Sequence, residues 1–321
     1  MDDVTDTVFR QVVAGCAPAD LYFTEFVNVD GLQSAGRSKL LKKLQFVASE
    51  KNLIAQLWGS NPENFRKTAQ EIADGTFARE LGLPEGCNFV GVDLNMGCPA
   101  KSEVKNGTCS ALILNRPLAE QIIEATREGL DGRLPLSVKT RLGFSEVDMT
   151  WIEFLLSKTL NMLTIHGRTR KEMSKVPAHW DLIGEAVKLR DKLSLNTLIV
   201  GNGDVETRQQ AQELAEQYGL DGIMIGRGVF HDPYVFAETS PWESITPDER
   251  IELYRKHVQL FADTWKHNER PIHTLNKFCK IYINGFDGAK ELRERLMDAQ
   301  SSDELLEILA ATQLRATAVA S

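Results

Sequence analysis

Short apolar runs rich in β-forming residues recur along the chain, and each is followed by a loop that contains glycine, asparagine or a charged residue. These runs are Leu21–Phe26, Leu53–Leu57, Phe89–Leu94, Leu136–Lys139, Met162–His166, Thr197–Gly201 and Gly222–Gly226. The segments between them have apolar residues at helical spacing, as in Asn61–Asp74, Leu118–Gly129 and Glu206–Tyr218. Alternation of strands and helices is typical of an α/β fold with a parallel sheet covered by helices.

The pattern contains seven strand candidates, one fewer than a TIM (β/α)₈ barrel needs. The natural place for the absent strand is before Met1, because Met1–Arg10 has the pattern of a loop that leads into a helix. We therefore expect a TIM-type barrel whose first strand is missing from the chain. Such a sheet either regains a strand from an upstream segment or stays open at one edge.

Beyond residue 240 the pattern becomes helical only. The expected helices are Pro247–His267, His273–Ile283, Lys290–Ala299 and Asp303–Thr312. We expect a barrel domain over residues 1–240, a helical bundle over 241–315, and a disordered tail over 316–321, which has little to bury.

Composition restricts the class of protein. A hydrophobic content of 42% and a charged content of 26% are typical of a soluble globular protein. No apolar run approaches the roughly 18–20 residues of a membrane span, and no basic-then-apolar leader opens the chain. The five cysteines include no C-x-x-C pair, and the histidines lack ligand spacing. We expect a monomeric cytoplasmic protein without a catalytic metal.

Charge is distributed unevenly. The net charge of −8 argues against nucleic-acid binding over the whole surface. Residues 36–67, however, carry seven Lys or Arg and two acidic residues. This segment is either a solvated helix face or a docking surface for a polyanion.

One cysteine lies where an α/β fold gathers its chemistry. Cys98 belongs to the loop Asn95–Lys101, directly after the apolar run Phe89–Leu94. In parallel sheets the loops at the carboxyl ends of the strands face a shared crevice. Pro99 restricts the backbone beside the thiol. We therefore expect Cys98 to be a reactive residue.

The last two strand candidates end in glycine-containing loops that indicate a phosphate site. These loops are Gly201–Asp204 and Gly226–Gly228, the second of which includes Arg227. Barrels commonly bind phosphate in the loops after strands seven and eight. No G-x-G-x-x-G opens a βαβ unit, which disfavours a Rossmann site. Lys139 is expected to point inward, where its charge suits a cofactor that becomes negative during turnover, such as a reduced flavin; His166 is either a core histidine or a ligand contact.

Several motifs, in one order along the chain, resemble those of the tRNA-dihydrouridine synthases. They are Met1–Asp6 with Phe9-Arg10, Gln56–Gly59, Asn95–Pro99, Val138–Gly143, His166–Arg170, Gly201–Asp204 and Gly226–Gly228. The tail segment Lys277–Leu309 is similar to the helical tRNA-binding domain of that family.

The resemblance implies an FMN-dependent reduction of the uracil C5–C6 double bond in tRNA, with NADPH as electron donor. Cys98 would donate a proton to C5 while the flavin delivers hydride to C6, and the uracil must be extruded from its stack. The residues that would bind the cofactor are Met1, Asp2, Gln56, Lys139, His166, Asn202, Gly203, Asp204, Gly226 and Arg227. Those that would meet the uracil or the RNA backbone are Asn95, Arg141, Arg168 and Arg170.

The chain departs from the family pattern at two places. The family has Ala-Pro and a strand before the methionine, and this chain begins at Met1. Asn106–Ala111 stands where the family has a run of glycine and alanine, so Cys109 is expected to be a small packed residue. Two other interpretations remain open: an FMN barrel that reduces a free pyrimidine, and a tRNA-binding protein without catalytic activity.

Overall fold

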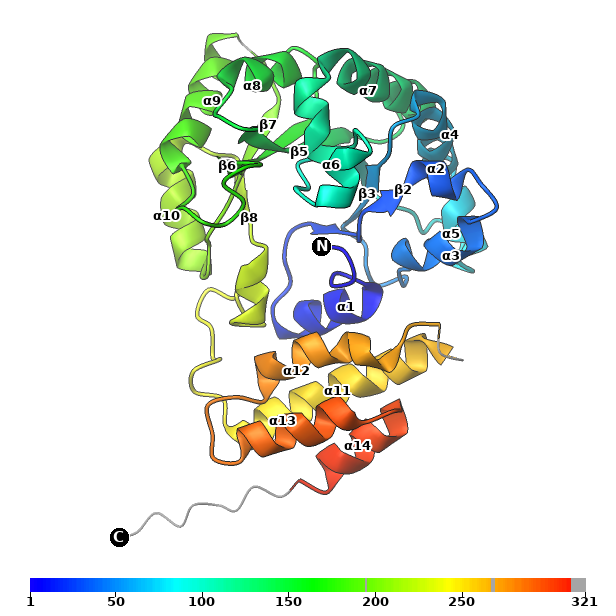
Figure 1. The fold of residues 1–321 in the computed structure, drawn as a ribbon, viewed down its shortest axis with the longest axis vertical. Helices are drawn as coiled ribbons and strands as arrows, with labels where there is room; N and C mark the ends of the chain where they lie inside the picture. Colours follow the sequence, from blue (N-terminus) through cyan, green and yellow to red (C-terminus); the bar gives the residue numbers. More distant parts are fainter. Residues whose placement is uncertain (194, 267–268, 313–321) are drawn as a thin grey trace. The chain divides into compact units, whose positions relative to one another are not determined.

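The structure is a computed structural model that describes residues 1–193, 195–266 and 269–312. Its internal contacts divide the chain into two units (Figure 1). The first unit combines Met1–Thr7 with Ala19–Gly228, and the second combines Val8–Pro18 with the chain from Val229 onward. The boundary expected after residue 240 thus falls inside the second unit. The tail expected over 316–321 lies outside the described residues.

The first unit contains a parallel sheet with the order β1-β3-β4-β5-β6-β7-β8, and β2 also pairs with β3. All seven predicted runs form strands, which confirms the α/β class and the parallel sheet. The strands are β1 (Tyr22–Phe23), β2 (Val27–Asn28), β3 (Leu53–Trp58), β4 (Gly91–Met96), β5 (Leu136–Gly143), β6 (Met162–Thr169), β7 (Leu198–Asn202) and β8 (Gly222–Met224). Within the described part of the chain, β1 and β8 lie at opposite ends of this order and do not pair with each other.

The predicted strand over residues 21–26 is shorter in the structure, where β1 covers only Tyr22–Phe23, and the buried Glu25 lies between β1 and β2. Glu25 is completely buried, accepts a hydrogen bond from the Asp3 N–H at 2.8 Å, and lies 3.8 Å from the Lys43 ammonium. The Thr24 hydroxyl accepts a hydrogen bond from the Gln56 N–H at 3.0 Å, in place of a backbone carbonyl of the neighbouring strand. The backbone of β1 and β2 therefore meets β3 in two short pieces.

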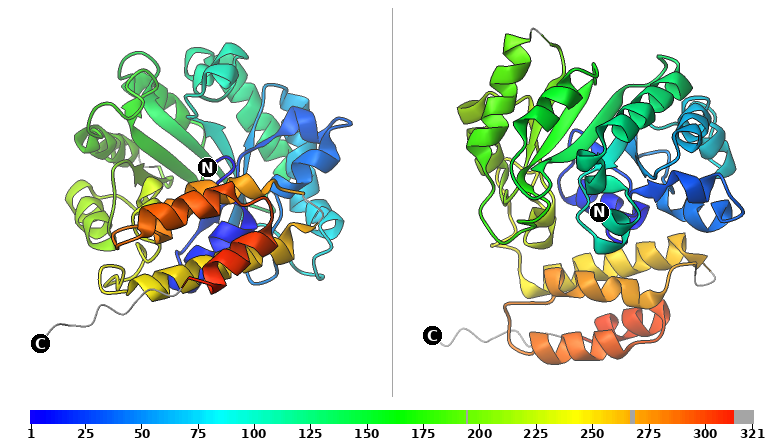
Figure 2. Two further views of the ribbon diagram at one scale, coloured as in Figure 1. Left: turned by 60° about the horizontal axis from the view of Figure 1, so that its bottom comes forward. Right: turned by 45° about the horizontal axis from the view of Figure 1, so that its top comes forward.

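The longer helices of the first unit follow the outer side of the sheet, and the turned views of Figure 2 show the same arrangement. The three helices predicted between strands are confirmed within two residues at each end. The helices of this unit are α2 (Val29–Leu32), α3 (Arg37–Leu40), η1 (Leu41–Lys43), α4 (Pro62–Ala73), α5 (Thr76–Glu80), α6 (Lys101–Lys105), η2 (Cys109–Leu114), α7 (Arg116–Leu130), α8 (Met149–Leu156), α9 (Trp180–Lys192) and α10 (Arg208–Tyr218). A further short helix, η3 (Arg227–Phe230), begins in this unit and ends in the second.

The strands present apolar residues to the helices and polar residues to the opposite face. Val92, Leu94 and Met96 of β4 belong to the same buried core as Ile122 of α7 and Trp151 of α8. Successive side chains of a strand point to opposite faces, so Asp93 and Asn95 lie on the side away from these helices. The same alternation recurs along β5 and β6 and leaves a polar face free for chemistry.

Within its described residues the second unit contains helices and connecting loops but no strand, as predicted from the pattern beyond residue 240. Its helices are α1 (Thr7–Cys16), α11 (Pro247–Thr264), η5 (Ile272–Leu275), α12 (Asn276–Tyr282), α13 (Ala289–Asp298) and α14 (Ser302–Ala310). The Phe9 ring of α1 lies 4.7 Å from the Phe278 ring and 5.9 Å from the His257 ring, which explains why α1 belongs to this unit. In the described segments, every helix is too short or too polar to cross a membrane.

Candidate active site

The carboxyl-terminal halves of the strands bring predicted site residues into register. Gln56 of β3 lies beside Asp93 of β4, and Asn95 of β4 lies beside Lys139 of β5. Arg141 of β5 pairs in register with His166 of β6, which in turn pairs with Asn202 of β7. Neighbouring residues in register on parallel strands point to the same face. These residues therefore form one continuous polar row, which we call the strand-end row: Gln56, Asp93, Asn95, Lys139, Arg141, His166 and Asn202.

Asp93 anchors one end of the strand-end row. Its carboxylate is completely buried and accepts hydrogen bonds from Ser137 Oγ at 2.6 Å and Gln56 Nε2 at 2.8 Å. Burial raises the pKa of Asp93 to about 6, although these two hydrogen bonds and the Lys139 charge act in the opposite direction. Ser137 was not among the predicted site residues; its two-residue spacing from Lys139 was the available signal.

Lys139 reaches across the row. Its Nζ donates to Asn202 Oδ1 at 3.1 Å, two strands away, and Asn202 Nδ2 donates to the Met224 carbonyl at 2.8 Å. Burial is the largest cause that lowers the pKa of Lys139 to about 8, and the Arg141 charge adds to it. The ammonium is thus partly desolvated and faces the interior, where a negatively charged ligand would stabilise it.

The loop after β4 holds Cys98 through Asn95. The Asn95 Oδ1 accepts hydrogen bonds from the N–H groups of Gly97 at 3.1 Å and Cys98 at 3.0 Å. A Cβ on Gly97 would lie 3.2 Å from the Thr140 backbone, so glycine permits this close approach. The buried Asn95 amide also reaches Gln56 Oε1 at 3.4 Å, which ties the cysteine loop to the strand-end row.

A second thiol lies against Cys98. Cys109 is completely buried, as expected for a packed residue. Its side chain is the largest cause that lowers the pKa of Cys98 below its ordinary value, against the effect of burial. The Ala100 backbone and the Arg141 charge act in the same direction as Cys109. The two cysteines are free thiols.

The arginines after β5 and β6 are largely committed to protein groups. Arg141 donates from Nε to the Gly97 carbonyl at 2.8 Å and from Nη1 to the Thr169 carbonyl at 3.1 Å. Arg168 is 2% exposed and forms an ion pair with Asp204. Arg141 therefore braces the cysteine loop, and Arg168 links β6 to the loop after β7.

His166 and Arg170 complete this edge. Burial, followed by the charges of Lys139 and the nearby arginines, lowers the pKa of His166 to about 2, so its imidazole is neutral at pH 7. Its Nε2 lies 3.2 Å from Arg168 Nη1. Arg170 stacks over the Phe144 ring at 5.3 Å, and its buried Nε has no hydrogen-bond partner among the described residues. Arg170 thus offers a donor for a ligand.

The loops after β7 and β8 form the other end of the site. Gly203 has a φ of +142°, and a Cβ there would lie 2.7 Å from the Ala178 Cβ. Asp204 accepts from the Ala178 N–H at 3.1 Å and lies 3.5 Å from Arg227 Nη2. The Arg227 side chain is 60% exposed. A Cβ on Gly226 would meet no atom within 4 Å, so open space adjoins this loop.

The first two residues lie in a local turn of the same unit. The Met1 amino group donates to Thr5 Oγ1 at 2.7 Å, and Asp2 forms an ion pair with Lys43. In the described residues, the one group of carboxylates close enough to share a cation is Asp2, Asp3 and Glu25, and the Lys43 ammonium lies among them.

Two surface features lie away from the strand-end row. Within the basic segment 36–67, Arg37 pairs with Glu71 and Glu80 and stacks on Phe77, so the charge of this arginine is compensated locally.

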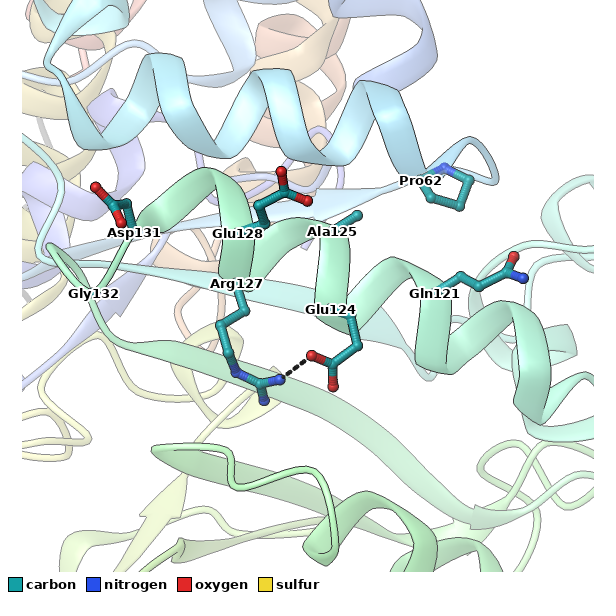
Figure 3. Close-up of a pocket in the computed structure, with 8 residues that line it drawn as sticks. All are labelled: Pro62, Gln121, Glu124, Ala125, Arg127, Glu128, Asp131 and Gly132. Carbon is teal, nitrogen blue, oxygen red and sulfur yellow. Dashed lines mark hydrogen bonds and ion pairs between the residues drawn. The ribbon is translucent and has the colours of Figure 1, made fainter.

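A surface hollow of about 820 Å³ lies along α7, as Figure 3 shows, and contains none of the predicted site residues. It is lined by Pro62, Gln121, Glu124, Ala125, Arg127, Glu128, Asp131 and Gly132.

Comparisons with known proteins agree with the resemblance of the motifs. The sequence model of the family described as "Dihydrouridine synthase (Dus)" matches residues 1–318. A "Probable tRNA-dihydrouridine synthase" of Staphylococcus aureus (strain COL) is 44% identical over 312 residues, covering 96% of this chain and 90% of that protein. The "Probable tRNA-dihydrouridine synthase 2" of Bacillus subtilis (strain 168) is 44% identical over 312 residues, covering 96% and 91%. A solved histamine dehydrogenase from Rhizobium sp. 4-9 is similar in fold alone, with a TM-score of 0.52 and 11% identity over 81% of this chain and 47% of that chain.

Proposed function

Because this chain belongs to the dihydrouridine synthase family, we propose that it reduces uridines of tRNA to dihydrouridine, with FMN as bound cofactor and NADPH as electron donor. The observation that carries the proposal is the strand-end row beside a held cysteine. The row presents a desolvated ammonium, Lys139, and the Asn95 turn fixes the Cys98 backbone at its edge. In this reaction the ammonium would stabilise the negative charge of the bound cofactor, and the cysteine would donate the proton.

The residues at the strand ends fit a flavin mononucleotide. Lys139 supplies a buried positive charge, and the open space beside Gly226 leaves room for a phosphate near the exposed Arg227. Backbone N–H groups of glycine loops and an arginine are common phosphate ligands. In this proposal Gln56, Lys139 and His166 hold the ring. The phosphate end belongs to Asn202, Gly203, Asp204, Gly226 and Arg227, with Met1 and Asp2 as backbone contacts.

The flavin, when bound, supplies the hydride that reduces the uracil ring. Cys98 provides the proton, because its thiol lies beside the strand-end row and its pKa is lowered toward neutrality. Arg141 holds the Gly97 carbonyl and keeps the thiol loop against β5. Arg170 has a free buried donor for the extruded base or its backbone, and Asn95 and Arg168 line the same edge.

We propose that the helical residues 241–315 bind tRNA and that residues 1–240 form the catalytic barrel domain. We further propose that the enzyme works as a monomer in the cytoplasm, where its tRNA substrate and NADPH are found. Membrane attachment and a metal ion have no part in this scheme.

Two measurements on the full chain test the proposal. The purified protein should be yellow with the visible absorbance of oxidised flavin, and should form dihydrouridine in an unmodified tRNA transcript with NADPH, detected by mass spectrometry of the nucleosides. Uridine monophosphate should not be reduced under the same conditions. Reduction of the monophosphate instead of tRNA would indicate a free-pyrimidine reductase. A colourless protein that binds tRNA without reducing it would overturn the enzymatic assignment.

A further inference from the structure

Four buried side chains on three neighbouring strands form a continuous series of hydrogen bonds, which we call the Asp93 network. It consists of Gln56 of β3, Asp93 and Asn95 of β4, and Ser137 of β5. Ser137 Oγ donates to Asp93 Oδ1 at 2.6 Å, and Gln56 Nε2 donates to Asp93 Oδ2 at 2.8 Å. Asn95 Nδ2 donates to Gln56 Oε1 at 3.4 Å, so the network reaches from β5 through β3 to the end of β4.

The two ends of the Asp93 network require the same orientation of the amides between them. At one end the ionised Asp93 carboxylate can only accept, so Gln56 must turn its NH₂ group toward it. At the other end the backbone N–H groups of Gly97 and Cys98 can only donate, so Asn95 must turn its oxygen toward them, at 3.1 and 3.0 Å. The Gln56 oxygen and the Asn95 NH₂ group are then left as acceptor and donor for each other.

From this geometry we infer that Asp93 is a positioning residue for the loop of Cys98, because it fixes the direction of the two amides that separate them. The inference rests on the proposed function, in which Cys98 gives a proton to the substrate. If the Gln56 amide were reversed, its NH₂ group would meet that of Asn95. Asn95 could relieve this contact only by turning its own NH₂ group toward the backbone donors of the loop, which would lose both hydrogen bonds.

Asp93 supplies this direction because it is ionised. Burial raises its pKa to about 6, with its two hydrogen bonds and the Lys139 charge acting in the opposite direction, so the carboxylate is charged at pH 7.5. An amide in its place could donate as well as accept and would leave the direction of Gln56 undetermined. Because the charge also acts on Lys139, a test must keep a carboxylate near that ammonium. Asn95 meets this need, since it pairs in register with Lys139.

The test measures hydrogen exchange of the Gly97 and Cys98 amides by mass spectrometry with residue-level fragmentation. It uses the full chain as purified, at pH 7.5, without tRNA or NADPH. In Asp93→Asn these two amides should exchange about 3- to 10-fold faster than in the unaltered chain, a factor that corresponds to the net contribution of one hydrogen bond. The amides of α7 should keep their exchange rates, which shows that the variant is folded.

A swap that preserves charge separates amide direction from packing. In Asp93→Asn with Asn95→Asp, the carboxylate accepts directly from the loop N–H groups, and the Gln56 amide can reverse so that each group again has a partner. The loop amides should return to the exchange rates of the unaltered chain. Ser137→Ala is the matched control. It removes the other hydrogen bond of Asp93 but keeps the carboxylate and both amides, so the loop amides should exchange as in the unaltered chain.

Unchanged loop amides in Asp93→Asn would overturn the inference, as would equal acceleration in Ser137→Ala or a swap variant as fast as Asp93→Asn. If Asp93→Asn unfolds, the swap decides: a folded swap variant with protected loop amides supports the inference, and an unfolded one overturns it. These measurements require no turnover. The expected exchange rates in a chain that forms no dihydrouridine would refute the proposed function alone, and an active chain with unchanged rates in Asp93→Asn would refute the inference alone.

Discussion

Replacement of Gly203 by alanine should destabilise the first unit, for two reasons that can be separated. A non-glycine residue held in a disfavoured backbone region costs about 1–3 kcal/mol, and the φ of +142° places Gly203 in such a region. The added Cβ would also lie 2.7 Å from the Ala178 Cβ. Ala178 cannot retreat freely, because its N–H is bonded to Asp204 and the next N–H, of His179, is bonded to Gly167 at 2.7 Å.

Overpacking of this kind costs about 1–3 kcal/mol, so the two costs together come to roughly 2–6 kcal/mol. For a domain of this size that corresponds to a fall of about 4–24 °C in Tm, measured by circular dichroism on flavin-free protein. Gly226→Ala is the matched control, because its Cβ would meet no atom within 4 Å; it should stay within about 0.5 kcal/mol of the original stability.

A double variant, Gly203→Ala with Ala178→Gly, separates the two causes. It should recover the part that comes from the close contact and retain the part that comes from the backbone. If Gly203→Ala melts within about 2 °C of Gly226→Ala, which corresponds to less than about 1 kcal/mol, the reasoning from backbone and contact is wrong.

Three further outcomes are expected. Cys98→Ala should lower dihydrouridine formation by on the order of 10²–10⁴, the range for a positioned acid, with flavin content and tRNA affinity unchanged; activity equal to that of the original would remove Cys98 from the mechanism. Arg227→Ala should reduce the flavin retained per protein after gel filtration without lowering Tm, since its side chain is 60% exposed; full retention would contradict the phosphate assignment. The pKa of Lys139 is lowered to about 8, so between pH 8 and about 10.4 the unfolded chain binds more protons and stability rises with pH. In urea unfolding, the free energy of unfolding of the unaltered chain should increase by on the order of 1 kcal/mol between pH 8 and pH 10. This increase should be absent from Lys139→Met, and equal pH slopes in the two proteins would refute the argument.

The organisation of the chain could be predicted from its sequence, since the signals for it are local. Apolar runs of strand length, helical spacing between them and a helical region beyond residue 240 each depend on residues close in sequence. The positions of Cys98 just after β4 and of Asn202 at the end of β7 followed from the same pattern, whereas the predicted end at Lys139 was wrong, because β5 continues to Gly143. Helices α8 and α9 were not singled out, although they lie where the alternation requires helices.

The contacts that make a site of these positions depend on tertiary structure. The register of five strands brings Asp93 to Ser137 and Lys139 to Asn202, residues separated by 44 and 63 positions. Burial then decides their charge: Lys139 and Asp93 acquire shifted pKa values only because the folded sheet removes them from water.

The sequence by itself determined which residues stand at strand ends and that Cys98 follows a buried strand. Only the folded chain decided that α1 packs with the helical unit and that Arg141 is committed to the Gly97 carbonyl. A pattern along the chain reports the direction of each side chain relative to its own element. Which partner that side chain meets, and how far water is excluded from the pair, depends on the packing of elements that are distant in sequence.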